Sequence, residues 1–259
     1  MVQRVALERH GDIATVTLNQ QDKLNAISLD MWDRLGEIFT RLDQDLSLRC
    51  IILRGAGARA FSVGADISEF EEHRSSAAKA KRYGKRTHGA LEKIVACRHP
   101  VLARIDGLCV GGGLELATTC DIRICSERSR FGIPIKRLGL VVAYAELAPL
   151  VQLIGPSNAK EILMEGQVFG ADRAYDMGLI NRVVADQELD REVQATAERI
   201  AEGAPLAARW HKAFTRRLLS PKPLTETEQD ECYACFATED FEIGYRAFLA
   251  KEKPAFRGK

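Results

Sequence analysis

The chain has almost no net charge. Its 37 lysines and arginines nearly balance 36 aspartates and glutamates among 259 residues, which leaves a formal charge of +1. No charge excess therefore favours nucleic acid or an anionic membrane as the main partner. The sequence also has no apolar run of membrane-spanning length, and no signal peptide or basic presequence is visible. We expect a cytoplasmic protein with neither nucleic acid nor a membrane as a partner.

A disulfide framework and a metal site are also not indicated. The seven cysteines are an odd number and lie mostly in apolar surroundings, a pattern typical of reduced thiols. The five histidines lack the spacing of metal ligands, so we expect no metal. No linker rich in proline, glycine or serine divides the chain, which is long enough to bury a large core.

Apolar patterns alternate between strand and helix through the first part of the chain. Strands are expected at residues 2–8, 13–18, 50–54, 101–105 and 122–125. Helices are expected at residues 28–43 and 76–96, and another begins near Gly111. This alternation predicts an α/β fold with crossover helices. From about residue 145 the pattern becomes helical, so we divide the chain into an α/β core, 1–195, and a helical C-terminal region, 196–259.

The segment 111–115 carries the clearest chemical signal, because three glycines run directly into Leu114 and Glu115. Glycines let a ligand approach the main chain closely. The first N–H groups of a helix have no internal partner and suit a developing oxyanion. Glu115 follows Gly112 by three residues and would lie on the same side of the first turn. The segment could supply an oxyanion donor and an acid/base; the alternative is a tight turn with a solvated glutamate.

Further segments, in order along the chain, complete a family pattern. They are Lys23 to Ala26, 61–67, Asp106 with Gly107, 111–117, 120–122, 131–134, Gly155 with Pro156, 174–184 and 248–251. Together they resemble the crotonase (enoyl-CoA hydratase/isomerase) superfamily over nearly the whole chain. The resemblance implies a spiral of repeated β-β-α units. It also implies C-terminal helices that build a homotrimer or a hexamer formed by two trimers.

The resemblance further implies an acyl-CoA thioester substrate, with coenzyme A as part of the substrate and no separate cofactor. Two backbone N–H groups, those of Ala65 and Gly112, would hold the thioester oxygen, and Glu115 would be the acid/base. The CoA-binding positions carried over from the family are Leu24, Ala26, Ala65, Asp66, Ile67, Ser68, Phe248 and Lys251. The last two usually come from a neighbouring subunit.

One position departs from the family. Typical hydratases place a second glutamate directly after the segment 131–134, and here that residue is Ile135. Isoleucine cannot hold or move a proton, although its apolar side chain would keep the pKa of Glu115 elevated in a dry pocket. Glu115 acting alone would suffice for double-bond isomerisation or slow hydration.

Three alternatives remain open. Another group could replace the missing acid, with Glu146 as the possible additional acid/base and Tyr144, Lys136 and His88 as nearby candidates. The chain could catalyse another crotonase reaction, such as decarboxylation, thioester hydrolysis or C–C cleavage. Lastly, it could be a catalytically weak acyl-CoA-binding protein.

Overall fold

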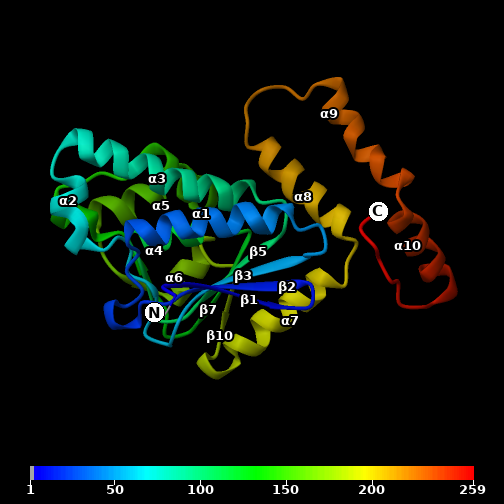
Figure 1. Ribbon diagram of the computed structural model, residues 1–259, viewed down its shortest axis with the longest axis horizontal. Helices are drawn as coiled ribbons and strands as arrows, with labels where there is room; N and C mark the ends of the chain where they lie inside the picture. The colour runs from blue at the N-terminus through cyan, green and yellow to red at the C-terminus, as the bar shows by residue number, and fades with distance from the viewer. Residues whose placement is uncertain (1–2) are drawn as a thin grey trace.

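The computed structural model describes residues 3–259 and begins with an antiparallel hairpin (Figure 1). Strands β1 (Val5–His10) and β2 (Ile13–Leu18) pair along their whole length. Gly11 has a φ of +61° in the tight turn between them, where a side chain would be strained. The first strand was expected from Val2, which lies outside the described residues.

The larger of the two sheets has six strands in the order β1-β2-β3-β5-β7-β10. Its remaining strands are β3 (Cys50–Gly55), β5 (Val101–Ile105), β7 (Ile122–Ser126) and β10 (Arg182–Val184). From β2 onward all neighbours are parallel. Every residue of β5 is buried, as expected for a strand that is covered on both faces.

A second sheet of four short strands has the order β4-β6-β8-β9. Its strands are β4 (Ala60–Ser62), β6 (Leu108–Val110), β8 (Arg130–Gly132) and β9 (Phe169–Gly170). Along the chain, β3, β5 and β7 in the first sheet are each followed by a strand of the second sheet. This is a spiral of β-β-α units, so the α/β class and the repeated architecture are confirmed.

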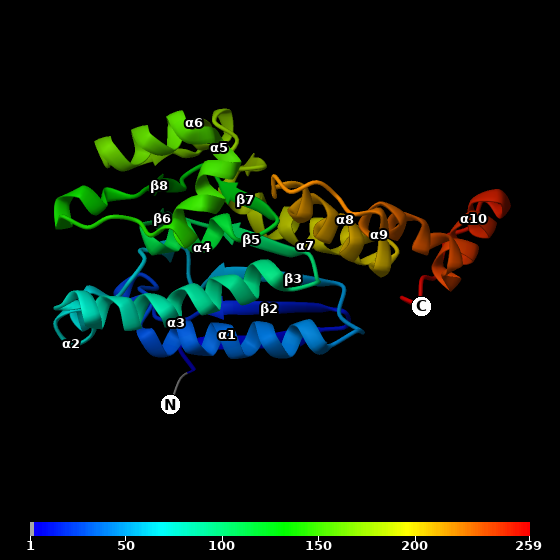
Figure 2. The same cartoon turned by 90° about the horizontal axis from the view of Figure 1, so that it is seen from above.

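Helices α1 (Leu29–Gln44) and α3 (Ala77–Ala96) pack against each other and contribute to the larger apolar core (Figure 2). Ser28 caps α1 by accepting a hydrogen bond from Met31 N, which fixes the start of the helix where the sequence predicts it. Helix α7 (Leu189–Ala201) contributes to a second core with other side chains of β2, β3, β5 and β7. The remaining helices of the spiral are α2 (Phe70–Arg74), α4 (Gly112–Thr118), α5 (Tyr144–Glu165) and α6 (Ala171–Asp176).

The C-terminal region extends away from the spiral as helices (Figure 1). It contains α8 (Pro205–Leu218), α9 (Glu226–Asp230), a 3-10 helix (Glu231–Ala237) and α10 (Glu239–Ala250). The expected division at 195/196 falls inside α7, where Val193 and Ala197 are both buried in the core with the sheet. The last turns of α7 therefore pack with the spiral. None of the helices within residues 3–259 is long and apolar enough to cross a bilayer.

Candidate active site

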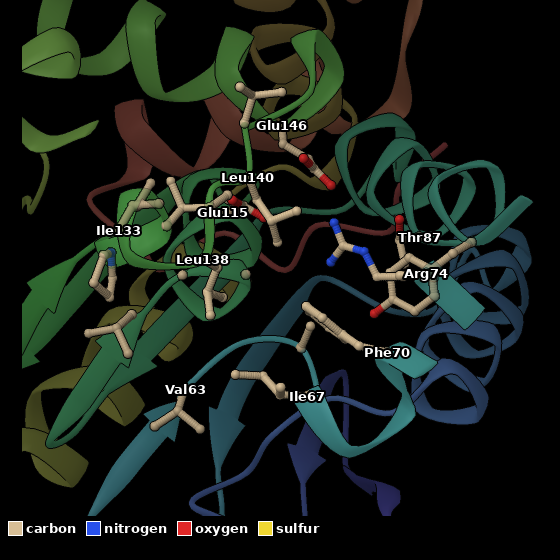
Figure 3. A pocket seen from close by; sticks show the side chains of 18 of the residues that line it. Val63, Ile67, Phe70, Arg74, Thr87, Glu115, Ile133, Leu138, Leu140 and Glu146 are labelled. Carbon is tan, nitrogen blue, oxygen red and sulfur yellow. The ribbon is translucent and has the colours of Figure 1, made fainter. Parts of the chain in front are cut away.

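A cavity of about 160 Å³ lies where α2, α3 and the N-terminus of α4 face the loop that precedes α5 (Figure 3). Its lining includes Ala65, Gly112, Glu115, Ile135 and Glu146, which come from widely separated parts of the sequence. The structure thus brings the predicted oxyanion donors, the predicted acid/base, the possible additional acid/base and the departing isoleucine to one cavity.

The two predicted oxyanion donors lie side by side because the main chain approaches itself closely at Gly64. This residue has a φ of +90°, and a Cβ there would lie 2.6 Å from Gly112 N. A Cβ built on Gly112 would lie 3.5 Å from Ala65 N and 3.6 Å from Glu115 Oε2. The two amide nitrogens and the carboxylate therefore surround one small volume.

Both amides are available to a ligand. Ala65 is flanked by hydrogen bonds from Ile27 N to Gly64 O (2.7 Å) and from Asp66 N to Ile27 O (3.1 Å). This parallel bridge leaves the N–H of Ala65 unused, and Gly112 is the first residue of α4, whose N–H has no helical acceptor. Within residues 3–259 neither amide donates a hydrogen bond. Two unpaired N–H groups at a cavity wall are an arrangement that can bind an anionic oxygen.

Glu115 is held in a state suited to proton transfer near neutral pH. The pKa of its carboxyl is raised to about 8, mainly by burial and also by the nearby charge of Glu146, while Arg74 opposes the shift. A group with such a pKa is mostly protonated at pH 7 and still yields a useful fraction of base.

Glu146 is fixed in place at the start of α5. Its Oε1 lies 3.1 Å from His88 Nε2, and its Oε2 accepts a hydrogen bond from Ala143 N at 3.0 Å. Of the other candidates, Tyr144 is 91% exposed and Lys136 is exposed, and neither lines the cavity. Of these groups, Glu146 is therefore the one whose carboxylate shares the cavity with Glu115.

The wall near Ile135 is apolar. Ile135 packs against the larger core and lines the cavity together with Ile133, Leu138, Leu140 and Val141. These side chains offer no partner to a water molecule. The position at which the family resemblance implies a second glutamate therefore offers no polar side chain to hold a reacting water.

The early segment predicted to contact CoA lies against the segment on both sides of Gly64. Val63 N donates to Leu24 O at 3.3 Å, and Ala26 is buried beside this contact. Leu24 and Asn25 both have left-handed backbone conformations, with φ of 53° and 55°. Asn25 Nδ2 holds this turn by donating to Ala56 O and Ala60 O. Non-glycine residues in this region are strained, and such strain gathers at ligand sites.

Asp66 is held as a carboxylate next to this turn. Burial alone would raise its pKa, but hydrogen bonds from Lys23 (2.7 Å) and Ser68 (2.6 Å) outweigh burial and lower the pKa to about 2. Ile67 is 58% exposed between Asp66 and Ser68. Four of the predicted CoA positions, Ala65 to Ser68, therefore form one short surface beside the cavity.

Phe248 and Lys251 are not brought to the cavity within one chain. They lie at the end of α10, on the opposite side of the molecule from α2 and α4 (Figure 1). Phe248 is 82% exposed there.

Sequence reasoning missed Arg74, the last residue of α2. Its guanidinium carbon lies 4.5 Å from the centre of the Phe70 ring and 5.0 Å from that of Tyr83, and all three side chains line the cavity. No periodicity in the sequence distinguishes this polar helix residue from its polar neighbours. Within residues 3–259 no group of three or more histidine, cysteine, aspartate or glutamate side chains is arranged to hold a metal ion.

Comparison with known proteins gives concordant matches. A family model described as enoyl-CoA hydratase/isomerase matches residues 8–259. The short-chain-enoyl-CoA hydratase of Clostridium acetobutylicum is 33% identical over 251 residues, which cover 96% of this chain and 95% of that protein. The crotonyl-CoA hydratase of Syntrophomonas wolfei is 33% identical, with 99% of each chain covered.

A solved structure is similar over the full length. The crystal structure of an enoyl-CoA hydratase/carnithine racemase from Magnetospirillum magneticum has a TM-score of 0.98 and 50% sequence identity. The match covers 100% of this chain and 97% of the other. It therefore includes the spiral and the C-terminal helices alike.

Proposed function

The chain belongs to the enoyl-CoA hydratase/isomerase family and is an acyl-CoA-processing enzyme of that type, and we propose that its reaction is proton transfer on an enoyl-CoA thioester. Glu115 removes and returns the proton, while the N–H groups of Ala65 and Gly112 bind the thioester oxygen. The proposal rests on one observation. Two backbone N–H groups without hydrogen-bond partners lie beside the carboxyl group of Glu115, whose pKa is about 8.

Removal of a proton from the acyl chain converts the thioester into an enolate, whose charge lies largely on oxygen. Fixed N–H donors stabilise this charge without reorganising, and loss of one such donor costs about 3–4 kcal/mol in other enzymes. Ala65 and Gly112 would provide two. The carboxyl of Glu115 lies next to them, so proton removal and charge stabilisation would occur within one small volume.

We favour double-bond isomerisation over hydration because the position at which the family resemblance implies a second glutamate holds Ile135, among apolar neighbours. In this reaction the proton leaves one carbon and returns to another, and no water is consumed. Glu115 would carry the proton between the two carbons, and Glu146, the possible additional acid/base, would assist its return. Hydration is the second candidate, because Glu146 also lines the cavity and influences the pKa of Glu115.

Coenzyme A is bound as part of the substrate in this proposal, and the chemistry calls for no separate cofactor. Leu24, Ala26 and the segment from Ala65 to Ser68 would contact the CoA of their own chain. Phe248 and Lys251 would reach it from a neighbouring chain of a homotrimer or hexamer, since they lie far from the cavity of their own chain. A cytoplasmic location is part of the proposal.

The first test is exchange of acyl-CoA protons with deuterium, followed by mass change. Glu115→Gln keeps the shape of the side chain and removes the base, so exchange should fall about 100-fold or more while CoA affinity stays nearly the same. Glu146→Gln separates the two candidates: loss of water addition with retained exchange supports hydration through Glu146. Full activity of Glu115→Gln on every accepted ester would refute the assignment.

A further inference from the structure

Arg74 is the one cation among the described residues that line the cavity. Its side chain extends from the end of α2 toward the part of the cavity where Glu115 and Glu146 lie (Figure 3). Within residues 3–259 it forms no hydrogen bond and no salt bridge, although most arginines of the spiral are paired. Its five N–H donors are thus unused at the wall of a largely apolar cavity.

The position of the guanidinium is fixed by two aromatic rings. The rings of Phe70 and Tyr83 lie 4.5 and 5.0 Å from the guanidinium carbon, within cation–π range. Tyr83 is buried, so this support is rigid. The two rings restrain the side chain without using its hydrogen-bond donors, which remain directed at whatever enters the cavity.

The two acids of the cavity do not neutralise Arg74. Glu146 is engaged by His88 and by Ala143 N. Glu115 is mostly protonated at neutral pH, because burial raises its pKa to about 8. A partly buried cation without a partner is unfavourable, and an anionic group on a ligand would relieve that cost.

We propose that Arg74 binds a carboxylate at the far end of the acyl chain, so that the enzyme prefers short enoyl-CoA esters of dicarboxylic acids. The planar guanidinium fork matches a carboxylate with two parallel hydrogen bonds. A cavity of about 160 Å³ is close to the roughly 150 Å³ of an engineered cavity that holds benzene, which suits a chain of a few carbons. An acyl group with a cationic end is disfavoured, since Arg74 already occupies the aromatic faces.

This inference rests on the proposed function in one respect: it takes Ala65 and Gly112 as the site of the thioester. Its test is a binding measurement that needs no turnover. Glutaryl-CoA and pentanoyl-CoA have the same chain length and differ in a terminal carboxylate or methyl group. Calorimetry on the assembled protein should show about 10- to 100-fold tighter binding of glutaryl-CoA.

Variants of Arg74 test the source of that preference. Arg74→Gln should abolish the preference by weakening glutaryl-CoA alone, and Arg74→Lys should keep only part of it, because the charge remains but the fork is lost. Arg82→Gln is the matched control: it removes one positive charge from the exposed surface of α3, outside this cavity, and should retain the wild-type preference.

Several results would overturn the inference about Arg74. Equal or tighter binding of pentanoyl-CoA by the wild type, or an unchanged preference in Arg74→Gln, would overturn the inference. The inference would also fail if Arg74→Gln shifted the pH profile of proton exchange equally for glutaryl-CoA and pentanoyl-CoA. Arg74 would then act only on the protonation of the two glutamates. Failure of the proposed function would show in the exchange assay of Glu115→Gln and not in these affinity ratios.

Discussion

Helices of the spiral and helices of the C-terminal region look alike in sequence but differ in burial. Both α1 and α8 have apolar residues at helical spacing. Helix α1 has eight buried residues, whereas α8 buries only Pro205. The difference shows that an amphipathic sequence predicts a helix with one apolar face, but does not say what covers that face.

The uncovered faces are concentrated toward the C-terminus. The large apolar side chains exposed there are Leu218, Leu219, Leu224, Tyr233, Phe236, Phe241, Tyr245, Phe248 and Leu249. Phe241 contacts both Phe236 and Tyr245, so part of this surface is a continuous aromatic row. Extended apolar surface of this kind marks an interaction site. A second copy of the chain is the partner that the proposed function requires.

The largest expected effect comes from removing part of this surface. Deletion of residues 242–259 takes away most of α10, including Phe248 and Lys251. We expect it to convert a trimer or hexamer into smaller species and to abolish measurable CoA binding, while the circular dichroism of the spiral stays close to that of the full chain. Light scattering and calorimetry check the two effects.

A matched control keeps the chain length and changes only a polar position. Lys222→Gln alters an exposed residue between α8 and α9 and should leave the assembly intact. If the full-length protein is a monomer at micromolar concentration, the account of the exposed apolar faces is wrong.

The sequence predicts the parts of the fold that have long local patterns. Ser28 marks the start of α1, and Ser76 caps α3 in the same way by accepting from Lys79 N. The second sheet was missed because its strands have only two or three residues, too few to show alternation. Its existence depends on contacts between distant segments.

The candidate site likewise contains residues with a local sequence signal and residues that are placed only by contacts between distant segments. The glycine-rich segment and Glu115 carry a local signal, and the family resemblance supplies Ala65. The pairing of Glu146 with His88 joins residues 58 positions apart, so it follows only from the way α3 and α5 pack. Arg74 is set in place by Phe70 and Tyr83, and nothing in the sequence shows that these rings face one cavity.

An intermediate effect should appear in the stability of the spiral. The pKa of Glu115 is raised from 4.5 to about 8 in the folded state. Folding therefore favours the protonated form, and this contribution is full below pH 4.5 and is lost as the pH rises through 8. Above that pH the buried carboxylate lowers the free energy of unfolding, by an amount on the order of a few kcal/mol.

Glu115→Gln removes this titration. Relative to wild type, the variant should gain thermal stability at pH 9 that it does not gain at pH 4, as measured by melting temperature. Glu231→Gln, at an exposed glutamate of the C-terminal region, is the control. It should not change the melting temperature differently at pH 9 and pH 4. Equal effects of Glu115→Gln at both pH values would show that its carboxyl is not held in a low-dielectric site.

The smallest effect concerns Lys251, which in the proposed function contributes to CoA binding but not to the chemistry. Lys251→Gln should weaken CoA binding about two- to five-fold at low salt, the range of one partly exposed ion pair. The loss should shrink as salt is added, because ions screen an exposed phosphate contact within about 10 Å at 0.1 M. Proton exchange at saturating ester should remain at the wild-type rate, in contrast to Glu115→Gln. Calorimetry at two salt concentrations measures the first effect and mass spectrometry the second.

A different result would contradict the proposed division of roles between the spiral and the C-terminal helices. If Lys251→Gln lowers the exchange rate at saturation and leaves affinity unchanged, this residue at the end of α10 acts on the reacting part of the substrate.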